Sequence, residues 1–329
     1  MKRPALTLLN AYLLAAAALP VVATAQGQVQ LSYLGTAGWE ITDGKTVILV
    51  DPYLSRLKME IPGAAVAPDD PRPTVPLDGI ASPDTSVIVA HIQRADFILL
   101  THTHIDHVLD MPYIAQKTRA LVIGTESTTN FAHDSGVPDA QLVTVKGGDD
   151  LDFRVFSVLV IPSLHSIMRH APNMAYFPPL PPPSTVFPRD AKPPFRMQDL
   201  LIEGGTLAYF IRLGGVRILV FGSMNYIERE VEGLRPDVAI IGAGGGRGDV
   251  YEYTSRLLRA IGYPPVVLPT HWDRFNLPYS ASQQPAMERL QSFIQEVKAA
   301  SPNTQVIVPT YFQPISVKPA SNGTKPKEP

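Results

Sequence analysis

Short apolar runs separated by turn residues dominate the first part of the chain after residue 28. Val29–Gly35, Trp39–Thr42 and Val47–Val50 are rich in β-branched and aromatic residues, and Gly38 and Asp43-Gly44 stand between them. Runs of this length and composition, bounded by glycine and Asp-Gly, are typical of β-hairpins. The pattern therefore predicts three consecutive strands at the edge of a sheet.

Strands and helices alternate along the rest of the chain. Phe97–Leu100 is a continuous apolar run, as expected for a strand that is buried on both faces. A helix at about 107–118 and a strand at 121–123 follow it. The second half predicts further strands at 207–213, 216–221, 238–241 and 266–268, and helices near 225–232, 250–261 and 282–299. This alternation in both halves predicts an α/β fold, an αββα four-layer sandwich in which outer helices cover two sheets.

Three segments lack such patterns. Residues 60–83 are rich in proline and alanine and predict a surface loop, and residues 317–329 have too few apolar side chains to pack. The proline-rich insertion at about 171–195 excludes a helix or a central strand, because proline has no backbone N–H to donate. Two interpretations of the insertion remain: a stiff surface linker, or a semi-rigid lid that carries Tyr176, Phe177 and Phe187.

The first 25 residues have the order of an export signal. Lys2 and Arg3 precede an apolar stretch, and Ala23-Thr24-Ala25 is a small-x-small cleavage site. We expect residues 1–25 to be a signal peptide and the protein to be periplasmic or secreted, with no stable membrane span after cleavage. An uncleaved N-terminal anchor is the alternative.

Composition narrows the functional classes. Hydrophobic residues make up 45% of the 329 residues, enough for a large core in a domain at 26–316. The formal net charge of −2 and the absence of a basic cluster argue against nucleic acid as a partner. The chain has no cysteine, which excludes disulfides, a thiolate metal ligand and a lipoprotein anchor.

Four potential metal ligands follow the predicted buried strand at 97–100. They are His102, His104, Asp106 and His107, and they lie within six residues. Imidazole suits zinc and its neighbours, and a carboxylate adds the charge that a second ion needs. A single histidine is more often structural, but buried histidines this dense would need many polar partners. The cluster therefore predicts a metal site.

These residues resemble the His-x-His-x-Asp-His signature of the metallo-β-lactamase superfamily. Leu34-Gly35-Thr36-Ala37-Gly38 and His165-Ser166 are similar to its ascorbate-6-phosphate lactonase-like branch. The resemblance implies that His102, His104 and His165 bind a first ion, and that Asp106, His107 and His271 bind a second. It also implies that Asp51 orients these ligands. We expect one or two zinc ions, with manganese or iron as alternatives.

Together with the export signal, the resemblance implies an exported metal-dependent hydrolase that directs metal-bound hydroxide at a lactone, ester or phosphodiester. Asp106 is the expected catalytic residue, which orients the nucleophile or accepts its proton. The aromatic insertion favours a small, amphiphilic substrate. Two other classes remain open: a non-catalytic metal- or ligand-binding protein with a degenerate site, and a di-iron oxidoreductase.

One position departs from the family pattern. Ser223 stands where the family places an aspartate that bridges both metals, so the second ion is expected to bind weakly. Two interpretations of its hydroxyl remain, a loose metal ligand or a cap on the following helix. We favour the cap, with Asn225 as a polar neighbour of the site. His91 and His133 are expected in surface or packing roles, and Asp273 is expected to pair with Arg274.

Overall fold

The structure is a computed structural model that describes residues 28–60, 67, 69–167 and 185–319. The predicted signal peptide lies outside the described residues, as do Tyr176, Phe177 and the end of the predicted tail. Among the described residues, no helix has both the length and the apolar character that a membrane span needs.

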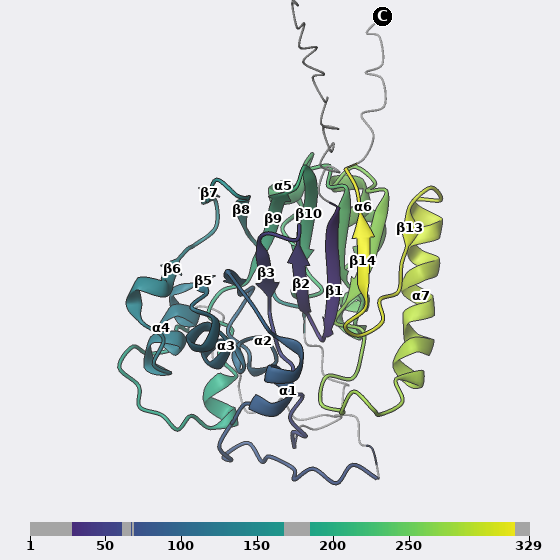
Figure 1. The fold of residues 1–329 in the computed structure, drawn as a ribbon. Helices are drawn as coiled ribbons and strands as arrows, with labels where there is room; N and C mark the ends of the chain where they lie inside the picture. The colour runs from purple at the N-terminus through teal and green to yellow at the C-terminus, as the bar shows by residue number, and fades with distance from the viewer. Residues whose placement is uncertain (1–27, 61–66, 68, 168–184, 320–329) are drawn as a thin grey trace, which may run out of the picture.

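Two seven-stranded sheets form the centre of the molecule (Figure 1). In spatial order, the first sheet contains β14 (Pro314–Val317), β1 (Val29–Gly35), β2 (Gly38–Thr42), β3 (Val47–Val50), β4 (Phe97–Leu99), β5 (Leu121–Gly124) and β6 (Leu142–Thr144). The second sheet contains, also in spatial order, β13 (Gln305–Val306), β12 (Val266–Thr270), β11 (Val238–Gly242), β10 (Val216–Phe221), β9 (Leu207–Leu213), β8 (Ser157–Pro162) and β7 (Asp150–Asp152).

Both sheets have the same internal plan. In the first, β14 to β3 pair antiparallel and β3 to β6 pair parallel. In the second, β7 to β10 pair antiparallel and β10 to β13 pair parallel. The carboxyl ends of neighbouring parallel strands meet at one edge of a sheet, and in open α/β sheets this edge is where ligands bind.

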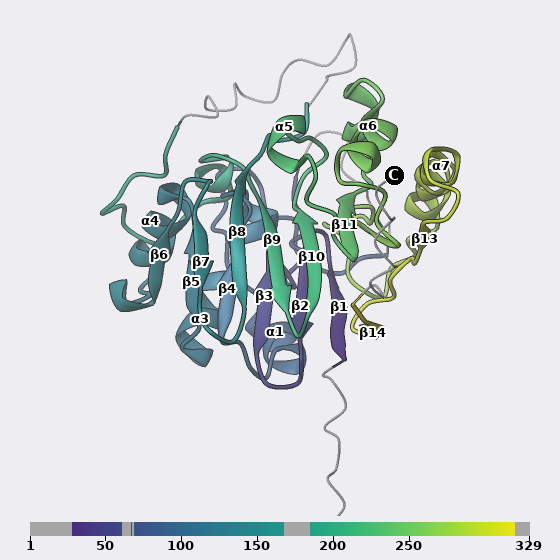
Figure 2. The same ribbon diagram turned by 90° about the horizontal axis from the view of Figure 1, so that it is seen from above.

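Helices cover the outer faces of the two sheets. Figures 1 and 2 show α3 and α4 on the opposite side of the sheets from α6 and α7. The helices are α1 (Thr85–His91), α2 (Ile105–Val108), α3 (Met111–Thr118), α4 (Glu126–Asp134), α5 (Glu228–Val231), α6 (Tyr253–Ala260) and α7 (Gln284–Ala300). Short 3-10 turns lie at Asp139–Gln141, Met197–Leu200 and Gly245–Asp249. The predicted αββα sandwich is confirmed.

The alternation of side chains between the two faces of each strand explains how the sheets and helices form layers. In β4, Phe97 and Leu99 belong to the core between the sheets, whereas Ile98 belongs to the core under helices α1 to α4. Successive strand side chains point to opposite faces, so a strand buried on both faces must be apolar throughout. A polar contact also joins the sheets, since Trp39 Nε1 donates to Thr270 Oγ1 over 3.0 Å.

The helix predicted at 107–118 is wrong in its extent. The structure has two helices, α2 and α3, which are separated at Leu109 and Asp110. Pro112 cannot donate to the carbonyl of Val108, so one continuous helix would leave that carbonyl unpaired. The helix expected at 225–232 is likewise limited to α5.

Candidate metal centre

Six residues predicted as metal ligands lie beyond the carboxyl ends of strands. Asp106 and His107 lie in α2, directly after the β4 strand end that also carries His102 and His104. His165 follows β8, and His271 follows β12. The topology thus brings residues that are up to 169 positions apart to one edge of the sandwich.

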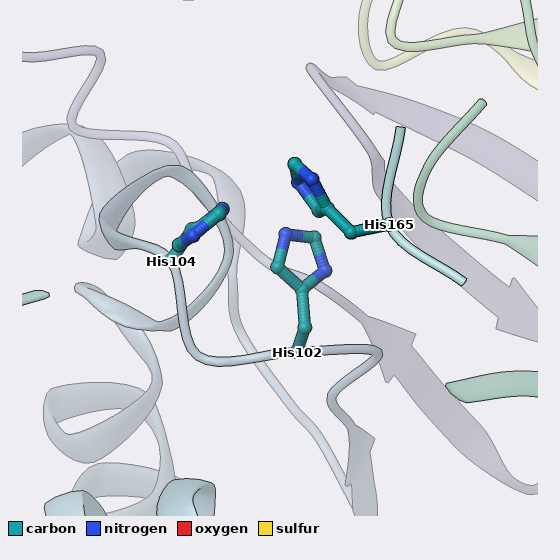
Figure 3. Close-up of side chains that lie close together, drawn as sticks. All are labelled: His102, His104 and His165. Carbon is teal, nitrogen blue, oxygen red and sulfur yellow. The ribbon is translucent and has the colours of Figure 1, made fainter. Parts of the chain in front are cut away.

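The first group of ligands is formed by three histidines. The ring centroids of His102 and His104 lie 4.8 Å apart, those of His102 and His165 4.9 Å, and those of His104 and His165 4.7 Å. The rings meet edge to face around a common point, as Figure 3 shows. One nitrogen of each imidazole lies within 4.8 Å of the others. Three imidazole nitrogens around one point fit a zinc ion with one position left for another ligand.

The second group adjoins the first. Asp106, His107 and His271 also offer ligand atoms within 4.8 Å of one another, and His271 Nε2 lies 3.3 Å from Asp106 Oδ2. The rings of His107 and His102 are only 3.8 Å apart between centroids, which places the two groups side by side. The six candidate ligands therefore form two adjoining groups.

Hydrogen bonds orient four of the five imidazoles so that each of these keeps a nitrogen for a metal. His107 Nδ1 lies 2.8 Å from Asp51 Oδ2, and His165 Nδ1 lies 3.1 Å from the carbonyl of Ser166. A ring N–H that donates to such an oxygen leaves the lone pair on the other nitrogen. The backbone carbonyl of Leu201 likewise accepts a hydrogen bond from the ring of His104.

His102 gives the clearest indication that a metal fits. The hydroxyl of Thr101 donates to Asp51 Oδ2 over 2.6 Å and lies 3.1 Å from His102 Nδ1. The hydroxyl therefore accepts from His102 Nδ1–H, and the lone pair of this imidazole is on Nε2. His102 Nε2 is buried without a hydrogen-bond partner. A buried polar atom without a partner is costly, and a metal ion beside it would supply the missing bond.

Electrostatics keep the first group neutral. Burial, followed by the neighbouring imidazoles, lowers the pKa of His104 to about 3 and that of His165 to about 4. In the second group, burial raises the pKa of Asp106, but His107 and His271 outweigh it and hold this pKa below its ordinary value. The first group thus offers neutral imidazoles and the second an ionised carboxylate, the protonation states that bind divalent ions. Burial lowers the pKa of His107, but Asp51 and Asp106 outweigh it and hold this pKa above its ordinary value.

Asp51 supports the centre as predicted. Its carboxylate is fully buried and accepts from Thr101 N over 2.7 Å as well as from the Thr101 hydroxyl and His107. The supporting roles of Thr101 and Ser166 were not predicted. A threonine or serine beside a histidine has no distinctive signal in a sequence.

The interpretation of Ser223 as a helix cap is wrong. The next helix, α5, begins at Glu228, and Ile227 occupies its N-cap position. Ser223 Oγ instead accepts from the backbone N–H of Ser166 over 2.8 Å, and Asn225 Nδ2 donates to the carbonyl of His165 over 3.1 Å. Both side chains therefore hold the segment that carries His165, and Asn225 is a neighbour of the site as predicted.

Other predicted roles have mixed outcomes. His91 stacks on Phe312 with 3.6 Å between ring centroids, and His133 contacts Asp139, so neither joins the six-residue centre. The expected pair of Asp273 with Arg274 is wrong, because the buried Asp273 pairs with Arg56 at 2.8 Å.

Phe187 is not part of a lid over the site. Its side chain is buried against Phe131 and Phe195 in the core under the helices, and its backbone N–H donates to Ser127 Oγ over 2.9 Å. This end of the proline-rich insertion is therefore anchored on α4.

A pocket of about 210 Å³ borders the second group at His271. Met224, Trp272 and Phe275 give it apolar walls, and the side-chain-free Gly244-Gly245 segment forms another part of its lining. Arg289 also lines the pocket, and among the described residues its guanidinium has no hydrogen-bond or ion-pair partner. The other charged group there, Asp273, is already matched by Arg56.

Comparison with known proteins agrees with this geometry. A family model described as the β-lactamase superfamily domain matches residues 30–271. The chain belongs to this superfamily. A UPF0173 metal-dependent hydrolase of Pyrobaculum aerophilum is 28% identical over 151 residues, which are 44% of this chain and 54% of that protein. The chain thus spans about half the length of this relative.

Two further similarities extend over most of the chain. A UPF0173 metal-dependent hydrolase of Ruegeria pomeroyi is 24% identical over 293 residues, covering 88% of this chain and all of that protein. The structure of Igni18, a metallo hydrolase of Ignicoccus hospitalis, has a TM-score of 0.52 at 15% identity and covers 88% of this chain and 99% of that one. The latter likeness shows the metallo-β-lactamase fold alone. None of these three comparisons names the lactonase-like branch, which stays a prediction.

Proposed function

We propose that this chain is a metal-dependent hydrolase whose reaction takes place at the two adjoining ligand groups. The observation that carries the proposal is the buried and unpartnered Nε2 of His102, in a triangle of imidazoles that are each hydrogen-bonded on one nitrogen. When bound there, zinc, manganese or iron would lower the pKa of a water molecule and polarise the bond to be cleaved. The similarity to proteins named metal-dependent hydrolases supports the same activity.

The residues of the chain have distinct tasks in this proposal. His102, His104 and His165 would hold one ion, and His107 and His271 would hold a second together with Asp106. We assign to Asp106 the orientation of the attacking water, because it is the carboxylate of the second group and its Oδ2 lies 3.3 Å from Nε2 of His271, which lines the pocket. Asp51 and Thr101 keep the rings of His107 and His102 in place.

The pocket beside His271 supports a small, amphiphilic substrate. Its apolar walls would contact a hydrocarbon part, and the unpartnered guanidinium of Arg289 would attract a carboxylate or phosphate group. A lactone, ester or phosphodiester that carries such a group fits both features. The similarity of Leu34–Gly38 and His165-Ser166 to the ascorbate-6-phosphate lactonase-like branch favours the lactone.

A panel of chromogenic esters, lactones and phosphodiesters tests this proposal. The metal-loaded protein should hydrolyse at least one class, and Arg289→Gln should raise KM about 10-fold for anionic members while neutral members change little. Arg259→Gln is the matched control, because this arginine is 62% exposed on α6 and does not line the pocket. A protein that binds metal fully yet cleaves no member would instead be the non-catalytic metal-binding protein.

Export is part of the proposal. The basic start, apolar stretch and Ala23-Thr24-Ala25 site support cleavage after residue 25 and a periplasmic or secreted product. N-terminal sequencing of the protein from the extracytoplasmic fraction should give Gln26 as the first residue. A protein that keeps Met1 there would show an uncleaved anchor instead.

A further inference from the structure

Unusual backbone conformations gather around the second ligand group. Four non-glycine residues there have a positive φ: Thr36 (56°), Asp51 (41°), Arg56 (46°) and His271 (53°). L-residues adopt this region at a cost, and such residues persist only where the surrounding contacts determine them. His271 itself is one of them, so its position as a ligand depends on what holds this backbone.

Arg56 is the centre of the contacts that hold the segment after His271. The residue is 1% exposed, and its guanidinium donates to Asp273 Oδ2 over 2.8 Å, to the Arg274 carbonyl over 2.6 Å and to the Leu277 carbonyl over 2.5 Å. Tyr279 and Tyr311 place their rings 4.8 and 5.4 Å from the guanidinium carbon. A buried arginine with three acceptors on one segment fixes the course of that segment.

Asp273 connects the contacts of Arg56 to the backbone of His271. Its Oδ1 accepts from Thr36 N over 3.0 Å and from the Tyr33 hydroxyl over 2.9 Å, and its Oδ2 also accepts from the Tyr311 hydroxyl. The carbonyl of Thr36 in turn accepts from His271 N over 2.5 Å. Thr36 is therefore held by Asp273 on one side and holds the backbone of His271 on the other.

The loop that carries Arg56 also supports the other histidine of the group. Asp51, at the start of this loop, orients His107 over 2.8 Å. Asp110, three residues after His107, accepts from the backbone N–H groups of Leu54 and Ser55 over 2.6 and 2.8 Å. Residues 51–56 are thus fixed to α3 by Asp110 and to the segment 273–277 by Arg56.

We propose that Arg56 is a positioning residue for the second metal ion, which acts through Asp273 and Thr36 on His271. Together with Asp51, it makes the loop 51–56 the element that sets the spacing of His107 and His271. The proposal rests on the metal centre proposed above. Arg56 does not belong to either ligand group, so its effect is on ligand geometry rather than on ligand number.

The consequence is selective for one of the two ions. The first group consists of His102, His104 and His165, none of which contacts Arg56, Asp273 or Thr36 in the hydrogen bonds described. Loss of a group that orients a ligand typically lowers metal affinity about 10- to 100-fold. We therefore expect this loss for the second ion and an unchanged affinity for the first.

Calorimetric titration of the metal-free full-length mature protein with Zn²⁺ tests the proposal. The variants are Arg56→Met, Arg56→Lys and Tyr311→Phe, with circular dichroism to verify folding. In Arg56→Met, the affinity for the second ion should fall about 10- to 100-fold. Arg56→Lys, which keeps the charge beside Asp273, should recover part of it, and Tyr311→Phe should show a smaller loss. Arg217→Met is the control, because it breaks an ion pair with Asp237 at the amino ends of β10 and β11.

The outcomes separate this proposal from the proposed function. The positioning role would be overturned if folded Arg56 variants lost affinity equally for both ions. It would also be overturned if both affinities were unchanged. If Arg56→Met does not fold, the same decision rests on Arg56→Lys and Tyr311→Phe. A wild type that binds both ions with the expected pattern in the variants, but hydrolyses nothing, would support the positioning role and contradict the hydrolase. A wild type without a second ion would contradict the positioning role itself.

Discussion

Ser223 Oγ accepts a 2.8 Å hydrogen bond from the backbone N–H of Ser166, the residue next to His165. The hydroxyl therefore supports the first ligand group and brings no negative charge to the centre. Without a bridging carboxylate, we expect the wild type to hold one ion tightly and a second only at higher metal concentration.

Ser223→Asp should raise the affinity of the second ion, because it adds a carboxylate where the family has one. Calorimetric titration with Zn²⁺ measures the two affinities. Ser223→Ala is the matched control: it removes the hydrogen bond, should destabilise the protein by about 1 kcal/mol, and should not strengthen the second site. If the aspartate gives no gain, the side chain at 223 points away from the ions.

Gly222→Ala should disrupt the second site through Asp51. A Cβ at this glycine would overlap Thr101 Oγ1 and lie 2.6 Å from Asp51 Oδ2, so both groups would have to move from the contacts that orient His102 and His107. We expect a loss of stability of about 1–3 kcal/mol, measured by urea unfolding.

The second-ion affinity should fall in the same Gly222→Ala protein. Gly245→Ala provides the comparison, because a Cβ there meets no atom within 4 Å. Similar metal affinities in the two variants would show that the close approach at Gly222 has no bearing on the ligands.

Asp84→Ala should weaken the fold and leave the metal centre intact. The Asp84 side chain caps α1 by accepting from Ser86 N and Val87 N, and loss of such a cap costs about 1 kcal/mol. The hydrogen bond from the Ser86 side chain lowers the pKa of Asp84 below its ordinary 3.8.

A lowered carboxyl pKa gives stability that is present above the pKa of the unfolded chain and is lost as pH falls towards the folded value. The difference in unfolding free energy between wild type and Asp84→Ala should therefore shrink between pH 6 and roughly pH 3. Urea unfolding at both pH values measures it, and a difference that grows on acidification would contradict the sign.

The sequence predicts the strands far better than the helices of the first half. β1, β3, β9 and β10 have the predicted bounds, because each is a compact apolar run with a glycine-containing turn on at least one side. Helices α1 and α4 were not predicted. In α4, Ser127-Thr128-Thr129-Asn130 is polar yet buried, since these side chains form hydrogen bonds with residues outside the helix. No periodicity along the chain indicates that environment.

The grouping of the six candidate ligands could be predicted because imidazoles and a carboxylate follow strand ends in the order of a known signature. The groups that hold them were largely beyond prediction. Thr101 meets Asp51 across 50 positions, and Arg56 meets Asp273 across 217. The first pair forms where the neighbouring strands β3 and β4 of one sheet end, and the second forms where the two sheets pack against each other. Neither residue type nor local spacing distinguishes these residues from ordinary surface charges and hydroxyls.

The metal content of the purified protein tests the central claim most directly. Elemental analysis of the mature wild type should give between one and two divalent ions per chain. His102→Ala, His104→Ala and His165→Ala should each lose most of the bound metal, because a three-histidine site cannot spare a ligand. His91→Ala, which removes a histidine stacked on Phe312 outside the centre, should keep the wild-type content. Full metal content in all three ligand variants, or no metal in the wild type, would contradict the account.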